Sequence, residues 1–127
     1  MNVSQLTKEF GGERDLIAKF ANIPSSAIQG IRLPFLQMSG DNSFQMLNEQ
    51  KMLYDLSWPS RNYPGLWPYT LDTLSQQDCV IGPCPKQQWN GTWVLPMLTW
   101  QDYRDFPCAM VDTCGDMYVN YNQIFGF

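Results

Sequence analysis

The chain has 127 residues, of which 44% are apolar and 16% charged, so it is long enough for one hydrophobic core of ordinary domain size. Eight basic and twelve acidic residues give a formal net charge of −4, and no cluster of Lys or Arg forms a basic stripe. Nucleic acid and anionic membrane are therefore not expected as partners, and no apolar run is long enough to predict a membrane span.

The first predicted element is an amphipathic helix over residues 6–20. Apolar residues recur along it at helical spacing: Leu6, Phe10, Ile17, Phe20 and Ala21. The glycine pair at 11–12 interrupts the pattern at a cost of about 1 kcal/mol per glycine relative to alanine. A helix that begins only after the glycines, near Glu13, is therefore the alternative. The Pro-containing sequence at 22–26 ends the helix.

The next predicted elements are a strand over 28–33, a second helix with its candidate N-caps at 39–43, and a strand over 52–54. The second helix is expected to turn Phe44, Leu47 and the stem of Lys51 toward the core. Alternation of helices and strands over about fifty residues indicates βα units around a parallel sheet. The predicted fold class is therefore α/β.

Residues 57–91 form a long region that is rich in Pro, Gly and aromatic residues. A loop of this length without regular structure is uncommon unless it is functional or stapled. Cys79 and Cys84 lie inside it and offer a staple. Two further short strands are predicted at 92–95 and 109–111.

The four cysteines fall into two close pairs, Cys79 with Cys84 and Cys108 with Cys114. Disulfides formed in an oxidising compartment are the leading interpretation, and pairing within each close pair is our hypothesis among three possible connectivities. A zinc site of four thiolates is the alternative. Its support is weak because the spacings are looser than those of Cys-x2-Cys zinc signatures.

Secretion is the expected destination of the chain. The first twelve residues show no signal-peptide pattern, so we expect a fragment whose leader lies upstream, and cytosolic residence is the alternative. Two Asn-x-Ser/Thr triplets, at 2–4 and at 90–92, are compatible with an extracellular protein.

Several consecutive stretches match one protein family. They are 13–23, Arg-Leu-Pro-Phe at 32–35, Tyr-Asp-Leu-Ser-Trp at 54–58, Pro-Gly-Leu-Trp-Pro-Tyr-Thr-Leu-Asp at 64–72, 77–85 and Cys-Ala-Met-Val-Asp-Thr-Cys at 108–114. Together they resemble the arthropod chitin deacetylases of the polysaccharide deacetylase family over residues 10–114, whereas 115–127 diverge. The resemblance implies a single partial domain over 1–127, folded as part of a distorted (β/α) barrel with a long disulfide-stapled loop region.

The same resemblance bears on catalysis. Family members hold a divalent metal, usually zinc, with an Asp-Asp pair and a His-x-x-x-His pair, and they remove N-acetyl groups from chitin. This chain contains no His, so no metal ligand or cofactor is expected in it. We therefore expect part of a chitin deacetylase-like hydrolase that is inactive as given. A non-catalytic pseudoenzyme that binds chitin or chito-oligosaccharide, or a product that does not fold alone, are the alternatives, and a monomer is expected.

Two residues carry over from the family to the catalytic machinery. Arg32 matches the motif Arg that orients a basic Asp through charge-assisted hydrogen bonds, and that Asp is missing here. Phe35 follows the motif Pro, and its backbone N–H is implied to contact the oxyanion that develops during the reaction. The simpler interpretation is that Arg32 is a surface arginine and Phe35 a buried aromatic side chain.

The resemblance also implies a substrate-binding wall. Trp58, with Asp55 and Ser57, matches the motif that lines the groove for the acetyl group, although Leu56 departs from the small polar residue usual there. Further tryptophans either stack on sugar rings or pack in the core: Trp67, Trp93 and Trp100. Of these, Trp67 is taken as the substrate-binding candidate.

Overall fold

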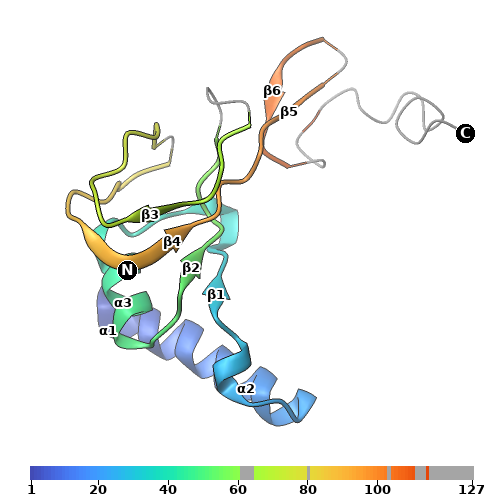
Figure 1. Ribbon diagram of the computed structural model, residues 1–127. Helices are drawn as coiled ribbons and strands as arrows, with labels where there is room; N and C mark the ends of the chain where they lie inside the picture. Colours follow the sequence, from blue (N-terminus) through green and yellow to red (C-terminus); the bar gives the residue numbers. More distant parts are fainter. Residues whose placement is uncertain (61–64, 80, 103, 111–113, 115–127) are drawn as a thin grey trace, which may run out of the picture.

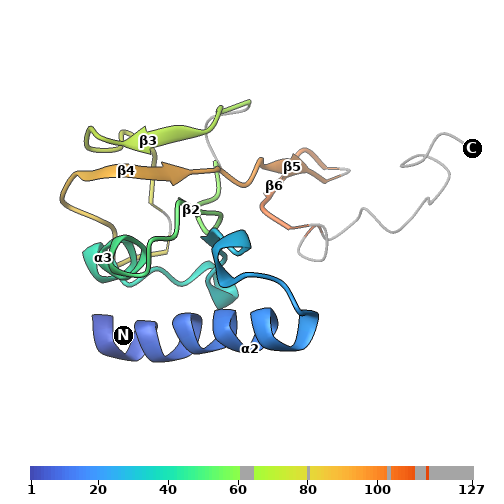
Figure 2. The same cartoon turned by 60° about the horizontal axis from the view of Figure 1, so that its bottom comes forward.

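The computed structural model describes residues 1–60, 65–79, 81–102, 104–110 and 114, which form a mixed α/β unit, as predicted (Figure 1). A four-stranded sheet lies above helix α3, and a long N-terminal helix lies beneath α3 on the side away from the sheet (Figure 2). A two-stranded hairpin extends beyond the sheet, past the carboxyl end of strand β4 (Trp89–Val94) (Figure 2). Helix length and hydropathy together exclude a membrane span among the described helices.

The N-terminal helix is continuous through its glycines. It consists of α1 (Val3–Leu6), a π-helical segment (Thr7–Gly11) and α2 (Gly12–Ala21), and it ends at Asn22 in a left-handed conformation. The predicted alternative of a start near Glu13 is wrong. A Cβ at position 11 would lie 3.0 Å from Oε1 of Gln50, so glycine permits the helix to approach the end of α3 closely. The helix continues through both glycines despite their low helix propensity.

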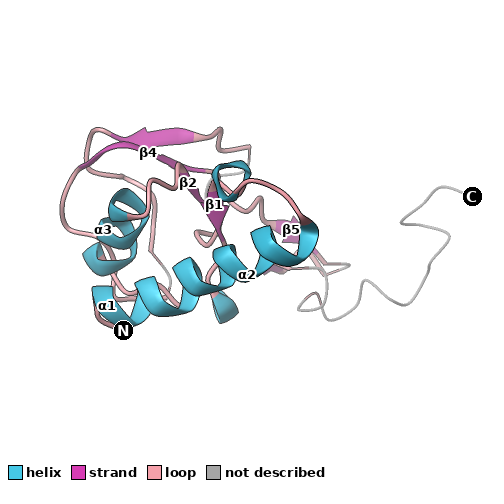
Figure 3. Ribbon diagram, turned by 90° about the horizontal axis from the view of Figure 1, so that it is seen from below, coloured by secondary structure: helices cyan, strands magenta, loops and turns pink. Residues whose placement is uncertain are grey.

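Three parallel strands and one antiparallel strand make the main sheet. In the order β1, β2, β4, β3 they are Gly30–Ile31, Tyr54–Asp55, Trp89–Val94 and Tyr69–Leu71. β1, β2 and β4 run parallel, and β3 pairs antiparallel with β4. Helix α3 (Asp41–Glu49) connects β1 to the adjacent parallel strand β2, which is the βα unit that the sequence predicted (Figure 3).

The strand boundaries differ from those predicted. β1 and β2 have only two residues each, so the predicted strands at 28–33 and 52–54 were too long or displaced. The region 57–91 is not without regular structure, because it contains β3 and the first residues of β4. At the end of the described chain, β5 (Trp100–Gln101) pairs with β6 (Pro107–Cys108) just before the predicted strand at 109–111, whose last residue lies outside the described residues.

Gly30 shows why a glycine is needed in β1. A Cβ there would lie 1.9 Å from Cε2 of Tyr54, because the ring of Tyr54 crosses directly over the neighbouring strand at this position. A β-strand glycine often marks such a close approach of another group. The short β1 therefore depends on the absence of a side chain at residue 30.

Helix α3 begins differently from the prediction. Its N-cap is Gly40, with φ +61°, and no side chain caps it. Ser43 instead accepts a hydrogen bond from the backbone N–H of Ser39 at 2.9 Å. Lys51 lies beyond the helix with φ +53° and is exposed, so the prediction that its stem faces the core is wrong.

Asp41 ties the start of α3 to the chain that follows the first disulfide. Its Oδ1 accepts hydrogen bonds from the backbone N–H groups of Lys86 and Gln87 at 3.0 and 3.1 Å, and from Nε1 of Trp89 at 3.1 Å. One carboxylate oxygen thus fixes the entry to β4 against α3. The sequence pattern predicts Asp41 only as one of several candidate caps.

The hydrophobic core lies between α3 and the sheet. Its buried members are Leu6, Ile31, Leu33, Met38, Phe44, Met46, Leu47, Met52, Trp58, Leu71 and Val94. The rings of Phe44 and Trp58 are 6.4 Å apart between centroids and tilted by 42°, and each large apolar side chain buried in this way contributes about 1.5–3 kcal/mol. Phe44 and Leu47 face this core as predicted.

Helix α2 contributes no buried side chain to that core. Its apolar residues Leu16, Ile17 and Phe20 are exposed, Phe20 to 82%. The strand β1 forms one edge of the sheet, with β2 as its only partner among the described strands. The apolar stripe of α2 is therefore left without a covering layer in the described part of the chain.

Both disulfides join the close pairs, Cys79 with Cys84 and Cys108 with Cys114. None of the four cysteines is free. The local pairing is the hypothesis reached from the sequence, and the alternative of a zinc site with four thiolates is wrong because a disulfide sulfur is not a thiolate.

Candidate functional site

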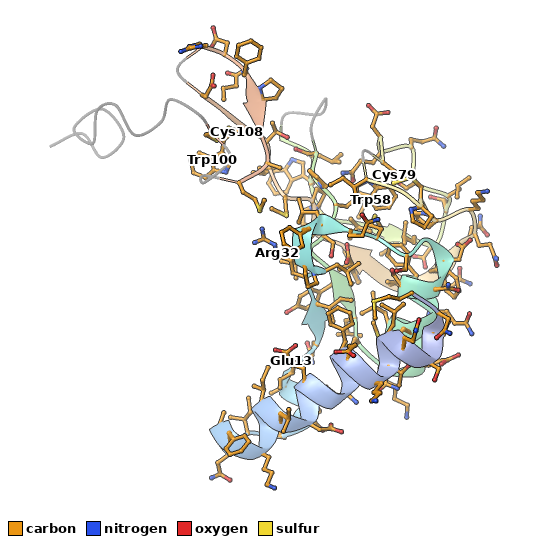
Figure 4. All side chains as sticks on the ribbon, turned by 180° about the vertical axis from the view of Figure 1, so that it is seen from behind. Glu13, Arg32, Trp58, Cys79, Trp100 and Cys108 are labelled. Carbon is orange, nitrogen blue, oxygen red and sulfur yellow. A yellow bond between two sulfur atoms is a disulfide. The ribbon has the colours of Figure 1, made fainter. Side chains whose placement is uncertain are left out.

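The candidate site lies at the carboxyl ends of β1 and β2. Arg32 directly follows β1, and Ser57 and Trp58 follow β2, so the parallel pairing brings them to the same edge of the sheet. Figure 4 shows Arg32 and Trp58 near this edge, and Glu13 on the helix below it. In open parallel sheets this edge is where ligands usually bind.

A buried hydrogen-bond network links the ends of the two strands. Oδ1 of Asp55 accepts from the hydroxyl of Ser57 at 2.6 Å, and Oδ2 accepts from the backbone N–H of Ser57 at 2.9 Å. Oγ of Ser57 in turn accepts from the backbone N–H of Leu33 at 2.8 Å. Asp followed two residues later by Ser favours this local turn, because a short carboxylate reaches the N–H at that distance along the chain. The network fixes the peptide that follows Arg32.

Burial determines the electrostatics of this network. Asp55 is 1% exposed, and desolvation raises the pKa of its carboxyl from 3.8 to about 6, against the lowering effect of the two hydrogen bonds from Ser57. Burial likewise raises the pKa of Tyr69 to about 12, and the hydrogen bond with Ser75 opposes this shift while the nearby charge of Asp55 adds to it. Since both oxygens of Asp55 are engaged and covered, this carboxyl orients its neighbours and has no open face for a substrate.

Trp58 is a core residue in the structure. It is 2% exposed, and its Nε1 donates to the backbone oxygen of Asp78 at 2.9 Å. Gln77 reinforces the same connection, since its Nε2 donates to the backbone oxygen of Pro59 at 2.8 Å and its Oε1 accepts from the hydroxyl of Tyr69 at 2.8 Å. The segment after β2 is thereby held against the chain that leads into Cys79. Gln77 was not predicted as a functional residue, because a glutamine in a loop carries no local signal. Tyr69 was not predicted individually either.

Arg32 presents its charge outside the core. Its guanidinium makes no hydrogen bond or ion pair with another described residue. Figure 4 shows it directed away from the sheet, and its side chain borders a cavity of about 190 Å³ between α2 and β1. A guanidinium that is exposed and has no partner among the described residues is suited to pair with a carboxylate.

Phe35 lies in a strained turn after β1. Phe35 and Leu36 both have left-handed backbones, with φ +54° and +55°, which costs non-glycine residues about 1–2 kcal/mol each. The Phe35 side chain is 90% exposed, so it is not the buried aromatic of the simpler reading. Its backbone N–H donates to no described residue, whereas the N–H groups of Leu36 and Gln37 bond to Leu33 and Pro34 at 3.1 Å. Strained turns of this kind cluster at functional sites.

Trp67 reaches the same edge of the sheet by topology. It lies two residues before β3, and β3 begins opposite Val94 near the carboxyl end of β4. Its side chain is 83% exposed, and no ring contact joins it to Trp58 among the described residues. Trp93 and Trp100 are also exposed. Of the four tryptophans considered for substrate binding, Trp58, Trp67, Trp93 and Trp100, only Trp58 packs in the core.

The described residues do not fit a zinc centre. No group of three or more His, Cys, Asp or Glu side chains lies close enough to hold a metal ion within the described ranges. The whole sequence lacks His, and all four Cys are in disulfides. The donor set that catalytic zinc requires, usually three protein ligands with histidine among them, is therefore not provided by these residues.

Comparisons with known proteins agree with the motifs. No protein-family model matches the chain. Chitin deacetylase 8 of Bombyx mori is 53% identical over 111 residues, which are 86% of this chain and 29% of that protein. Chitin deacetylase 1 of Bombyx mori is 35% identical over 90% of this chain and 24% of that protein. The chain thus spans less than a third of the length of these relatives.

Proposed function

We propose that this chain, which is homologous to insect chitin deacetylases as its motifs predicted, corresponds to the part of such a hydrolase that supports the substrate site. In this proposal the whole enzyme removes N-acetyl groups from chitin, and the chain as given does not. The observation that carries the proposal is the combination of 53% identity with a sequence that has no histidine. The chain keeps the scaffold motifs while the imidazole groups that the family uses are missing.

The proposed contribution of this chain is made by Arg32 and by the backbone N–H of Phe35. Neither group has a partner in the part of the chain that the structure describes. An exposed guanidinium of this kind is suited to orient a carboxylate base, and such an N–H on a strained turn is suited to contact an oxyanion. The network of Asp55 and Ser57 fixes the peptide of Leu33 between them. These roles need a base and a metal that the described residues do not supply.

We further propose that the sheet is one arc of a (β/α) barrel. The unit β1–α3–β2 is the βα unit from which such a barrel is built, and β4 continues the parallel order beside β2. The open edge of β1 and the exposed apolar stripe of α2 are the surfaces that a preceding strand and its helices would cover. Since the matched residues are only 29% of Bombyx mori chitin deacetylase 8, that relative has enough further chain to supply those elements.

An extracellular location is part of the proposal. Two disulfides in a chain of this size suit an oxidising compartment, because cytosolic thiols are kept reduced. The cysteines alone carry this step. Retention of both disulfides after recovery from culture medium is the expected outcome.

The test of inactivity is direct. The purified chain is incubated with fully acetylated chito-oligosaccharides and zinc, and acetate is measured, with Bombyx mori chitin deacetylase 8 as the positive control. We expect acetate from the control and none above buffer from the chain. Zinc-dependent acetate release by the chain, lost on adding a chelator, would contradict the proposal.

A second candidate function is favoured by the exposed tryptophans. A flat indole ring that is 83% exposed, as in Trp67, is a surface on which a sugar face can stack. In that case the chain holds chitin without cutting it. Retention on chitin beads that is lost in Trp67→Ala but kept in Trp67→Phe would support this function. Trp58→Ala is unsuitable as a test because removing a buried Trp costs about 3–5 kcal/mol of stability.

A further inference from the structure

We propose that Asn90 is an N-glycosylation site, and that it receives its oligosaccharide before β4 packs against α3. The triplet Asn90-Gly91-Thr92 has the sequence that the oligosaccharide transferase requires, Asn followed two residues later by Thr with no Pro between them. The modification is separate from chitin chemistry. It uses only the extracellular route included in the proposed function.

The triplet lies in an irregular part of β4. Thr70 pairs with Trp93, and the next residue, Leu71, pairs with Trp89, so residues 90–92 form a bulge between these two pairs. Asn90 is exposed, and its side chain makes no hydrogen bond with a described residue. Gly91 adopts φ +75°, and its N–H donates to Oδ1 of Asp72 at 2.7 Å. A glycan on Asn90 would therefore leave the strand without displacing any of these contacts.

Thr92 determines when the transfer takes place. Its side chain is 2% exposed, and its Oγ1 accepts a hydrogen bond from Nδ2 of Asn48 on α3 at 3.3 Å. The hydroxyl that completes the triplet is therefore covered once β4 lies on α3. The transferase can read it only on the unfolded chain, whereas the finished glycan at the exposed Asn90 is compatible with the fold.

The chemistry is a group transfer from a lipid-diphosphate-linked oligosaccharide. Nδ2 of Asn90 attacks C1 of the first sugar, and the bond between C1 and the diphosphate oxygen breaks. One amide proton passes to a base of the transferase, and the lipid diphosphate leaves. A neutral amide then carries the glycan, and no oxidant or reductant is consumed.

The glycan would lie far from the candidate site. Asn90 is at the start of β4, which runs parallel to β1 and β2, whereas Arg32 and Ser57 follow the ends of those strands. Figure 2 shows β4 running from its start above α3 toward the β5–β6 hairpin. The modification and the proposed substrate edge therefore occupy opposite ends of the sheet.

The test expresses the full chain in insect cells behind a cleavable secretion signal, which supplies the secretory route whatever the native leader is. Mass spectrometry before and after digestion with an amidase specific for Asn-linked glycans measures the modification. We expect an amidase-sensitive mass on the wild type that is absent from Asn90→Gln and Thr92→Val and present in Thr92→Ser. Asn2→Gln is the matched control for the second triplet and should keep the mass.

Two results would overturn the proposal. One is a wild-type chain that enters the secretory route, shown by removal of the signal, yet carries no amidase-sensitive mass. The other is an amidase-sensitive mass in Asn90→Gln that is as large as that of the wild type. The timing is tested separately with bacterially produced chain and a purified transferase with its lipid-linked donor, where the denatured chain should be modified and the folded chain should not. Equal modification of both forms would contradict the timing.

Discussion

The buried carboxyl of Asp55 should make the stability of the fold depend on pH in an unusual direction. In the folded chain its pKa is about 6, and its ordinary value is 3.8, because burial disfavours the charged form. Between these two values the unfolded state binds fewer protons than the folded state. The free energy of unfolding therefore falls as pH rises. This stabilising contribution is complete below pH 3.8 and is lost as pH rises through about 6.

The size of the effect follows from the same two values. A difference of one pKa unit corresponds to about 1.4 kcal/mol, so the change from 3.8 to about 6 amounts to about 3 kcal/mol. Asp55 is almost completely buried, and therefore little of this is removed by solvent screening. For a chain of this length, 3 kcal/mol is a substantial part of the total stability.

The assay is urea unfolding of the wild type and of Asp55→Asn at a series of pH values from about 3 to about 8. The amide has a similar shape and does not titrate, so the difference in unfolding free energy isolates Asp55. We expect the unfolding free energy of the wild type minus that of Asp55→Asn to fall by about 3 kcal/mol as pH rises. Asp72→Asn is the control, because hydrogen bonds from Gly91 and Thr70 lower the pKa of this exposed carboxyl, and its contribution should be lost as pH falls. A difference for Asp55→Asn that is flat or rises with pH would refute the reasoning.

Three further predictions concern local contacts, each measured by urea or thermal unfolding. Gly30→Ala should lower the free energy of unfolding by about 1–3 kcal/mol, because the added Cβ meets the ring of Tyr54. Gly12→Ala, where the added Cβ has open space, should raise it by about 0.5–1 kcal/mol. Equal stabilities of the two variants would contradict the ring contact. Asp41→Ala should lose about 2 kcal/mol because three donors lose their acceptor, and Asp41→Asn should lose less. Replacing both Cys79 and Cys84 by Ser should cost about 2 kcal/mol through release of a short loop, and an unchanged midpoint would show that the loop is held by other contacts.

The sequence predicted the order of the elements well because periodicity and helix-stopping residues are local. The helices around Leu6 and Phe44 and the βα connection between them follow from such patterns. The helix over 6–20 was also predicted, but local patterns could not exclude the alternative start near Glu13, because Gln50, which lies against Gly11, is 39 positions away in the chain. β3 was missed because its three residues lie in a region dominated by Pro and Gly.

The candidate site was predictable only in part. The motif residues near Arg32 and Asp55 were found through the family resemblance, and the parallel pairing of β1 with β2 places them at one edge of the sheet. Exposure could not be predicted, because it depends on which elements cover each side chain. Trp58 and Trp67 are similar in sequence context, yet the first is buried and the second is exposed.

Exposure also decides which motif residues bear on function. Asp55, Ser57 and Trp58 are buried and hydrogen-bonded. Ser57 links Asp55 to the residue after Arg32, and Trp58 bonds to the chain before the first disulfide. Folding alone explains why these residues are needed. Their presence therefore does not distinguish part of a deacetylase from a chain that only binds chitin. Arg32 and the backbone N–H of Phe35 have no partner among the described residues, and the turn at Phe35 is strained. No contact with a described residue explains either feature, and therefore these two groups are the ones on which the proposed role in deacetylation rests.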